Sequence, residues 1–448
     1  MKHLLPIAMK AQASGGSERA YLIQLLPDPA GQVREYMTLF EIVATLLSLS
    51  ALFSYINARF IGLPTSIAVM AFSLAFSLVL VGINYLGGQD LTRWAEQLIA
   101  QVDLSETLLN GLLSFLLFAG ALHVNLDDLA DQKWLVALLA TLGVVVTTFL
   151  VGCAMWLVLG WLTIPLPFIY CLLFGAVVAP TDPVAVLAIL KSVDTPRALS
   201  TKIAGESLFN DGVAVVMFIA ILGIAQGDRE VTFQGIGLLF LEEVVGGLVL
   251  GFVLGWVGYY LLRGLDNYQV EILVTIALVA GGYALASRLH MSGPLAVVVA
   301  GLMIGNHGRR YAMSEKTEQQ LDTFWELIDE VLNAVLFLLI GLEVLIVTFE
   351  LPVLLAGLAA IPLVLLARLV AVGVPVMALK PFQEHTSSSI LALTWGGLKG
   401  GISVALALTL PAGPERDLIL PMAYAVVVFS ILFQGLTVKR FLGRAAAE

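Results

Sequence analysis

The sequence predicts an all-α polytopic membrane protein, and three observations support this fold class. Hydrophobic residues make up 59% of the 448 residues, charged residues make up only 12%, and the mean hydropathy is +0.95. Soluble domains carry about 25% charged residues. Apolar runs of about 18 residues or more recur from Met37 almost to the C-terminus, and each can cross a bilayer core about 30 Å thick as a helix. These properties exclude an ordinary soluble protein.

The apolar runs, taken in order between their polar breaks, predict about 13 transmembrane segments. Their expected ranges are 37–56, 62–83, 107–124, 134–162, 166–191, 200–226, 232–262, 269–288, 293–306, 323–348, 352–379, 386–410 and 416–438. The stretch 91–104 is too short and too charged to span the bilayer, so we expect it to lie along the membrane interface.

The distribution of Lys and Arg predicts the orientation of these segments. Among the connecting loops, ten cations follow odd-numbered segments and four follow even-numbered segments. The positive-inside rule places the cation-rich loops in the cytoplasm. The transmembrane domain, 37–438 with a core around 134–226 and 352–438, would therefore lie in the inner cell membrane. An outside N-terminal tail, 1–36, would precede it, and a short cytoplasmic tail, 439–448, would follow it.

Two of the predicted segments are interrupted in mid-membrane. The fifth contains Pro180-Thr-Asp-Pro183, and two prolines three residues apart remove N–H donors and free backbone carbonyls. The twelfth contains Trp395-Gly-Gly-Leu-Lys-Gly-Gly-Ile-Ser403, in which four glycines weaken the helix. These segments match in position if segments 1–6 and 8–13 are two six-helix repeats joined by segment 7. Because one connecting segment inverts the second repeat, we expect inverted repeats whose interrupted helices cross.

The sixth segment carries polar residues on two neighbouring faces of one helix. Ser207 and Asp211 share one face, and Glu206 and Asn210 share another roughly 100° away. The first face can offer hydroxyl and carboxylate oxygens to a hard cation, and the second can be pinned by protein partners.

Arg368 and Lys399 lie in the middle of predicted segments, away from the loop cations at segment ends, and each needs a buried partner or an aqueous cavity. One interpretation is that the buried acids only pair with these cations to hold helices together, and we favour it for Glu206. For Asp211 we favour ion handling, because a desolvated carboxylate can exchange a proton for a small cation near neutral pH.

Three ordered motifs resemble the monovalent cation/proton antiporter family, in its bacterial sodium/proton exchanger branch. They are Pro-Thr-Asp-Pro at 180–183, Glu-Ser-Leu-Phe-Asn-Asp at 206–211 and Gly-Leu-Lys-Gly-Gly-Ile-Ser at 397–403. The resemblance spans nearly all of the segments from Met37 onward. It implies a secondary antiporter that exchanges Na⁺, or Li⁺ or K⁺, for H⁺. It also suggests a homodimer and an elevator-like movement of the half that contains segments 5, 6 and 12.

The resemblance also implies roles for the residues in these motifs. The aspartate of the family's Asn-Asp pair carries the cation or the proton, which falls on Asp211. Ser207, the Thr181 carbonyl and Asp182 would complete the site, with Asn210 counted among the ion-binding residues, and Na⁺ is expected at Asp211, Ser207 and Thr181. No resident cofactor is expected, because Na⁺ and H⁺ are the transported ions.

Three further positions follow from the same resemblance. The family's buried glutamate and its arginine partner correspond to Glu206 and Arg368, which would form a structural pair. Asn210 stands where electrogenic relatives carry a second acid, which implies one titrating carboxylate and electroneutral one-for-one exchange. The family's glycine-rich motif usually reads Gly-Leu-Arg-Gly, whereas this chain has Lys399. Lysine lacks the bidentate fork of arginine, so the role of Lys399 stays open.

Other classes of function fit the sequence less well. The net charge of −10 and the lack of a Lys/Arg block exclude nucleic acid as a partner. An enzyme is not expected, because His-Glu-x-x-His, Gly-x-Ser-x-Gly and Walker motifs are absent from the sequence. A proteolytic pair made of Asp182 and Asp211 would need a setting other than Pro-Thr-Asp-Pro. A passive cation channel and a K⁺-selective antiporter are the stronger alternatives.

Overall fold

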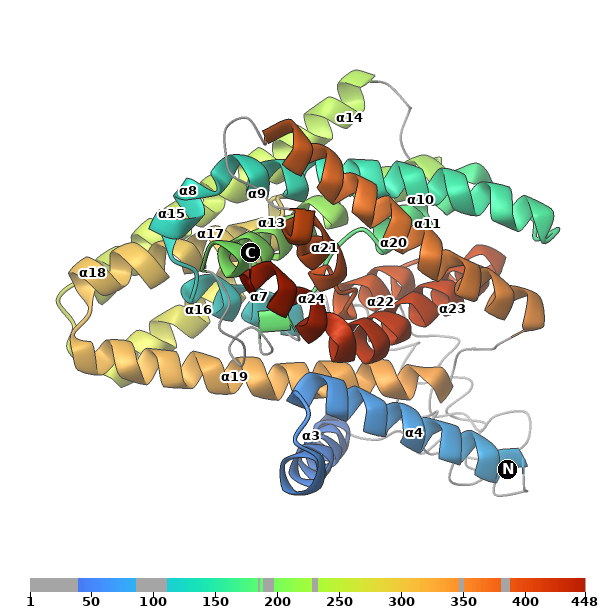
Figure 1. Ribbon diagram of the computed structural model, residues 1–448. Helices are drawn as coiled ribbons and strands as arrows, with labels where there is room; N and C mark the ends of the chain where they lie inside the picture. The colour runs from blue at the N-terminus through green and yellow to red at the C-terminus, as the bar shows by residue number, and fades with distance from the viewer. Residues whose placement is uncertain are drawn as a thin grey trace, which may run out of the picture.

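The computed structural model describes residues 39–85, 111–183, 186–187, 197–227, 233–345, 350–379 and 387–447. Every regular element in these ranges is helical (Figure 1), which confirms the all-α fold class. The predicted interfacial stretch 91–104 and the predicted tail 1–36 lie outside the described residues.

Eight helical runs in the described ranges are long and apolar enough to cross a membrane, and a ninth candidate is a helix pair bent by 45°. The eight are Phe40–Ile61, Thr65–Ile83, Lys133–Trp161, Arg197–Ala225, Leu241–Leu262, Tyr268–Arg288, Leu351–Leu379 and Pro414–Leu442, and the bent pair is Ser389–Gly396 with Gly401–Leu408. The chain is therefore a multi-pass membrane protein. Each of the 13 predicted ranges contains helical residues, but the number of crossings and the inverted repeats stay predictions.

One group of helices packs around the long α19, which runs along one side of the molecule with α4 against it (Figure 1). This first bundle consists of α3 (Leu39–Ile56), α4 (Thr65–Tyr85), α7 (Leu113–Leu122), α15 (Gly246–Leu262), α16 (Tyr268–Arg288), α17 (Gly293–Met303) and α19 (Glu315–Leu342). Small residues allow its closest approach: a Cβ at Gly251 of α15 would lie 3.0 Å from Cα of Ala296 in α17.

A second group packs around α20 on the opposite side of the molecule (Figure 1). This second bundle consists of α9 (Lys133–Ala140), α10 (Leu142–Trp161), α11 (Phe168–Val177), α13 (Arg197–Ala225), α20 (Leu351–Leu379), α21 (Ser387–Gly396), α22 (Gly401–Leu408), α23 (Pro414–Val428) and α24 (Gly435–Ala447). Shorter helical elements complete the chain: η1 (Asn57–Ile61), α8 (Leu126–Asp131), α14 (Phe233–Phe240), η3 (Leu241–Val245), η4 (Ile304–Gly308), α18 (Arg309–Ala312), η5 (Glu343–Leu345) and η6 (Phe429–Gln434).

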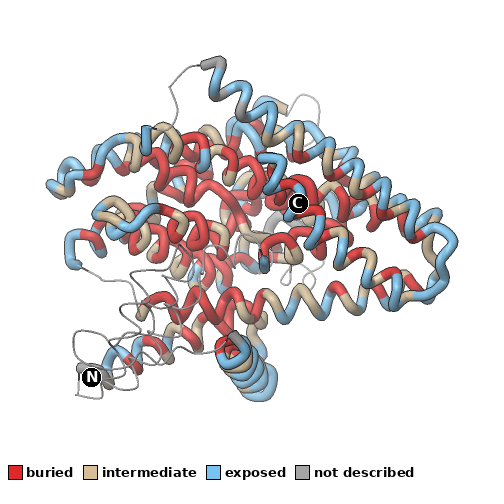
Figure 2. Tube along the Cα trace, turned by 180° about the vertical axis from the view of Figure 1, so that it is seen from behind, coloured by how far each residue is buried: buried red, intermediate tan, exposed pale blue. Residues whose placement is uncertain are grey.

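Apolar packing holds each bundle together and joins the two. One buried cluster, which includes Trp325 and Phe118, lies mainly in the first bundle and extends to α9 and α13, and another, which includes Phe174 and Met155, lies in the second. A third cluster combines residues of α3, α4 and α19 with residues of α21 to α24. Figure 2 shows buried residues concentrated between the helices and exposed residues on their outward faces. Many of these exposed residues are large and apolar, such as Trp161 (87% exposed), as expected for a surface in contact with lipid.

One of the ten cations counted in loops after odd-numbered segments, Lys202, lies within a helix. It is buried in α13, which begins at Arg197. Without it, the bias of loop cations is still nine against four. At the other end of the chain, α24 extends through residues 439–447.

Candidate functional site

The two interrupted helices meet at their breaks. Helix α11 ends at Val177, and residues 178–183 continue without helical structure as far as Pro183. The other break consists of residues 397–400, between α21 and α22. The backbone N–H of Asp182 donates a hydrogen bond to the carbonyl of Leu398 at 2.7 Å. The Pro-Thr-Asp-Pro run and the glycine-rich run therefore form one contact region.

Glycine is required at two positions because side chains approach the second break closely. A Cβ at Gly400 would lie 2.6 Å from Cγ of Asp182, and a Cβ at Gly397 would lie 2.9 Å from Cζ of Arg368. Contacts under 3.0 Å force a shift, so these glycines do more than weaken the helix. They make room for a carboxylate on one side and a guanidinium on the other.

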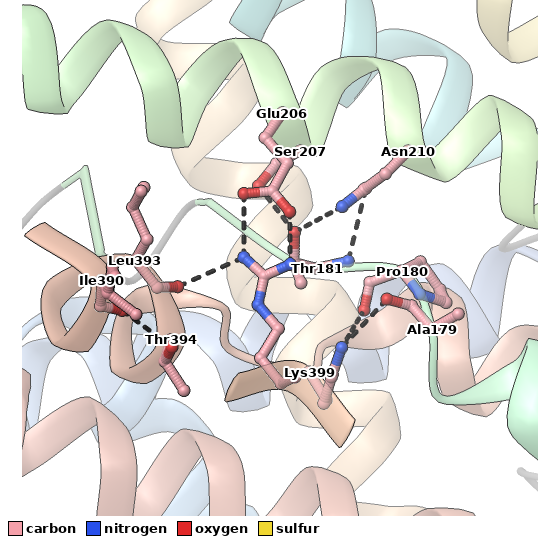
Figure 3. Close-up of polar contacts among 11 residues, drawn as sticks. Ala179, Pro180, Thr181, Glu206, Ser207, Asn210, Ile390, Leu393, Thr394 and Lys399 are labelled. Atoms are coloured by element: carbon pink, nitrogen blue, oxygen red, sulfur yellow. Dashed lines mark hydrogen bonds and ion pairs between the residues drawn. The ribbon is translucent and has the colours of Figure 1, made fainter. Parts of the chain in front are cut away.

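Lys399 bridges the two breaks (Figure 3). Its Nζ donates to the carbonyl of Ala179 at 2.9 Å and to that of Pro180 at 3.1 Å, and the residue is only 2% exposed. These carbonyls lie two and three residues beyond the C-terminal end of α11, in the non-helical stretch, where no N–H group of α11 pairs with them. Lys399 therefore satisfies backbone carbonyls of the break, a role that the sequence left open.

Thr181 is held by two residues of α13 (Figure 3). Its hydroxyl lies 3.0 Å from Oγ of Ser207 and accepts a hydrogen bond from Nδ2 of Asn210 at 2.7 Å. Oδ1 of Asn210 in turn accepts from the backbone N–H of Thr181 at 3.4 Å. Both ends of the Asn210 amide are thus engaged with Thr181, so the structure places Asn210 as a support of the break.

Asp211 differs from Glu206, the other buried carboxylate of α13, whose two oxygens both contact Arg368. Asp211 is 2% exposed, and its Oδ1 has no hydrogen-bond partner among the described residues. It lines a cavity of about 500 Å³ together with Asp182, Pro183 and Ser207. A desolvated carboxylate beside a cavity can accept either a proton or a cation.

Glu206 forms an ion pair with Arg368 of α20. The guanidinium nitrogens Nη1 and Nη2 donate to Oε1 and Oε2 of Glu206, and the distance from Nη2 to Oε2 is 2.8 Å. Nη2 also donates to the carbonyl of Leu393 at 3.2 Å. The side chains of Glu206 and Arg368 are 2% and 6% exposed. The pair therefore joins α13, α20 and α21 within the second bundle.

The contribution of α19 to the cavity lining was missed by the sequence analysis. It includes Glu326, Asp329, Glu330 and Asn333. Their spacing of i, i+3, i+4 and i+7 is the signal that could have identified one polar face on a helix expected to span the membrane. The lining also includes Thr65 of α4 and the residue that follows α7, His123.

Comparison with known proteins assigns the chain to a family. The family model described as sodium/hydrogen exchanger, transmembrane, matches residues 48–444. The chain is 50% identical to the Na⁺/H⁺ antiporter NhaP of Pseudomonas aeruginosa, over 91% of this chain and 97% of that one. It is 36% identical to the Na⁺/H⁺ antiporter NhaH of Halobacillus dabanensis, over 82% of this chain and 90% of that one.

The fold is similar to a solved structure as well. The sodium proton antiporter MjNhaP1 of Methanocaldococcus jannaschii superposes with a TM-score of 0.71 at 20% identity, covering 92% of this chain and 99% of that one. At this identity the likeness concerns the fold alone. Together with the family model and the two bacterial relatives, it leads to one conclusion: the chain belongs to the sodium/hydrogen exchanger family of monovalent cation/proton antiporters.

Proposed function

We propose that this protein is a secondary active antiporter that exchanges Na⁺ for H⁺ across the inner cell membrane by alternating access. The names of its bacterial relatives support the activity. One observation carries the mechanism: Asp211 lines a cavity and has a buried carboxylate oxygen, Oδ1, with no hydrogen-bond partner among the described residues, whereas Glu206 is paired with Arg368.

Cation and proton compete for Asp211 in this mechanism. Na⁺ is a hard cation that takes oxygen ligands. Asp211 and Asp182 supply carboxylates beside the cavity, Ser207 supplies a hydroxyl, and the Thr181 carbonyl completes the set. Asn210 holds Thr181 through its amide and cannot titrate. With Glu206 ionised against Arg368 and Asp182 in one protonation state throughout the cycle, Asp211 exchanges one proton for one monovalent cation, so transport is electroneutral.

The cavity provides the route to the site. Acidic residues of α19 line it, and a cavity lined by one sign of charge concentrates ions of the opposite sign. It reaches the start of α4 and the end of α7, next to loops that the positive-inside rule places in the cytoplasm. This conformation therefore opens to the cytoplasm, on the side of the C-terminus.

Alternation would come from the second bundle moving against the first, because the second bundle carries Asp211 and both breaks. The first bundle would stay fixed in a homodimer. Its α3 and α15 present large exposed apolar side chains, such as Phe40, Tyr55, Phe252 and Trp256, which can face lipid or a second copy.

Purified protein in vesicles with a trapped pH dye tests the function. Additions of Na⁺, Li⁺ and K⁺ in turn should show proton movement driven by Na⁺ and Li⁺ and a much weaker response to K⁺. A dominant response to K⁺ would identify a K⁺-selective antiporter. Cation flux that never moves protons in return would identify a passive channel and refute the proposal.

A further inference from the structure

Two buried polar residues lie on a π-helical stretch that follows α23. Ser430 and Gln434 belong to η6, Phe429–Gln434, and are 0% and 3% exposed. π-helical turns inside long helices are rare and occur frequently at functional sites. The mechanism described above uses neither residue.

A directional chain of hydrogen bonds links these two residues to the break between α21 and α22. The backbone N–H of Lys399 donates to Oγ of Ser430 at 2.8 Å. The Ser430 hydroxyl donates to Oε1 of Gln434 at 2.7 Å, and Nε2 of Gln434 donates to the carbonyl of Trp395 at 3.4 Å. The chain begins on one side of the break and ends on the other.

These bonds serve backbone groups that the half-helices leave unpaired. The N–H groups at the start of a helix and the carbonyls at its end have no partner within it. The N-cap of α22 is Gly400, which has no side chain to cap the helix. Ser430 therefore satisfies the N–H of Lys399, in the break just before this N-cap, and Gln434 supplies a donor for a carbonyl in the last turn of α21.

The hydrogen-bond chain through Ser430 and Gln434 is connected to the ion site through Lys399. Ser430 holds the backbone of this residue, and its ammonium group donates to the carbonyls of Ala179 and Pro180. The next two residues of that segment are Thr181, which contacts Ser207, and Asp182, which lines the cavity with Asp211. A shift of the Lys399 backbone would therefore reach the oxygen atoms around the cation.

We infer that Ser430 and Gln434 are positioning residues of the ion site, a clamp that fixes the broken helix so that Lys399 stays on the carbonyls of Ala179 and Pro180. The inference rests on the proposed function for its transport readout. Apolar side chains would fill the same space without unsatisfied polar groups, so a purely space-filling role would not require this pair.

Ser430→Ala and Gln434→Met remove the hydrogen bonds while keeping the positions filled. In vesicles, each variant should raise the half-saturating Na⁺ concentration about three- to tenfold, as expected for the loss of a buried hydrogen bond, and should displace the pH profile. Ser430→Thr keeps the hydroxyl and should restore both values. The double variant should be no worse than the worse single variant, because the chain acts as one unit.

Thr437→Val is the matched control. Thr437 lies on the following turns of the same helix and accepts a hydrogen bond from the indole of Trp395 at 2.9 Å, so it contacts the side chain and not the backbone of the break. Wild-type affinity and pH profile in Ser430→Ala and Gln434→Met, or an equal loss in Thr437→Val, would overturn the inference.

Hydrogen exchange gives a readout that does not depend on the transported ion. Ser430→Ala should accelerate deuterium uptake in peptides that cover 396–401 and 179–182, whereas Thr437→Val should not. Unchanged uptake would overturn the clamp even if transport were impaired. If Ser430→Ala accelerates deuterium uptake but the wild-type protein moves no protons in response to Na⁺, the proposed function is refuted and the clamp is supported.

Discussion

Removing one member of the Glu206–Arg368 pair should destabilise the protein more than it alters ion binding. The two side chains are 2% and 6% exposed, and the remaining charge would have no carboxylate partner. Loss of one partner from a buried pair costs about 3 to 5 kcal/mol in soluble proteins. Of the bonds from Arg368 to described residues, the one to the Leu393 carbonyl would remain, and the new amide could offer a neutral acceptor in place of the carboxylate. Glu206→Gln should therefore lower the melting temperature in detergent by roughly 4 to 10 °C.

A double variant separates charge from packing. Glu206→Gln combined with Arg368→Met removes both charges, so it should recover part of the lost stability, because an uncharged pair leaves no isolated buried ion. Glu330→Gln is the control, since Glu330 is exposed and accepts one hydrogen bond from Thr65 at 3.2 Å. Its melting temperature should match the wild type. A Glu206→Gln variant that melts normally but binds Na⁺ poorly would place Glu206 in the ion pathway and refute the structural assignment.

Four further outcomes are expected in proteoliposomes. Asp211→Asn should abolish Na⁺-driven proton movement in a folded, inserted protein, because an amide cannot release a proton; retained exchange would exclude Asp211. Since protons compete with Na⁺ at that carboxylate, lowering the pH should raise the half-saturating Na⁺ concentration by up to about tenfold per unit with little change in maximal rate. A clamped membrane voltage should not alter the flux. The electrical work of moving a charge across the membrane, about 2.3 kcal/mol per charge per 100 mV, is zero when no net charge moves, so a voltage-dependent rate would indicate a second titrating group. Gly400→Ala should block exchange, because the added Cβ would displace Asp182. Gly160→Ala is the control and should exchange like the wild type, because a Cβ there meets nothing within 4 Å. Equal activity of the two variants would contradict the close packing at Gly400.

The sequence by itself determined the class of the protein, because composition and the length of apolar runs depend only on local properties. It also located both breaks. Two prolines around Thr181 and four glycines around Lys399 disrupt helices wherever they occur. The Glu-Ser-Leu-Phe-Asn-Asp run ending at Asp211 is also visible in the sequence, because ionisable residues are costly inside an apolar segment and mark a candidate functional site.

Tertiary structure decided how these local features are joined. Lys399 caps carbonyls 219 and 220 residues away in the chain, and Arg368 pairs with an acid 162 residues away. The position of Asn210 on its helix allows its side chain to bind either a protein partner or an ion. Its hydrogen bonds with Thr181, seen only in the structure, show that the amide is occupied. Periodicity specifies which face of a helix a residue occupies, but not which helix packs against that face. The acidic wall of α19, and the connection from Ser430 through Lys399 to the ion site, therefore became visible only when the helices were packed together.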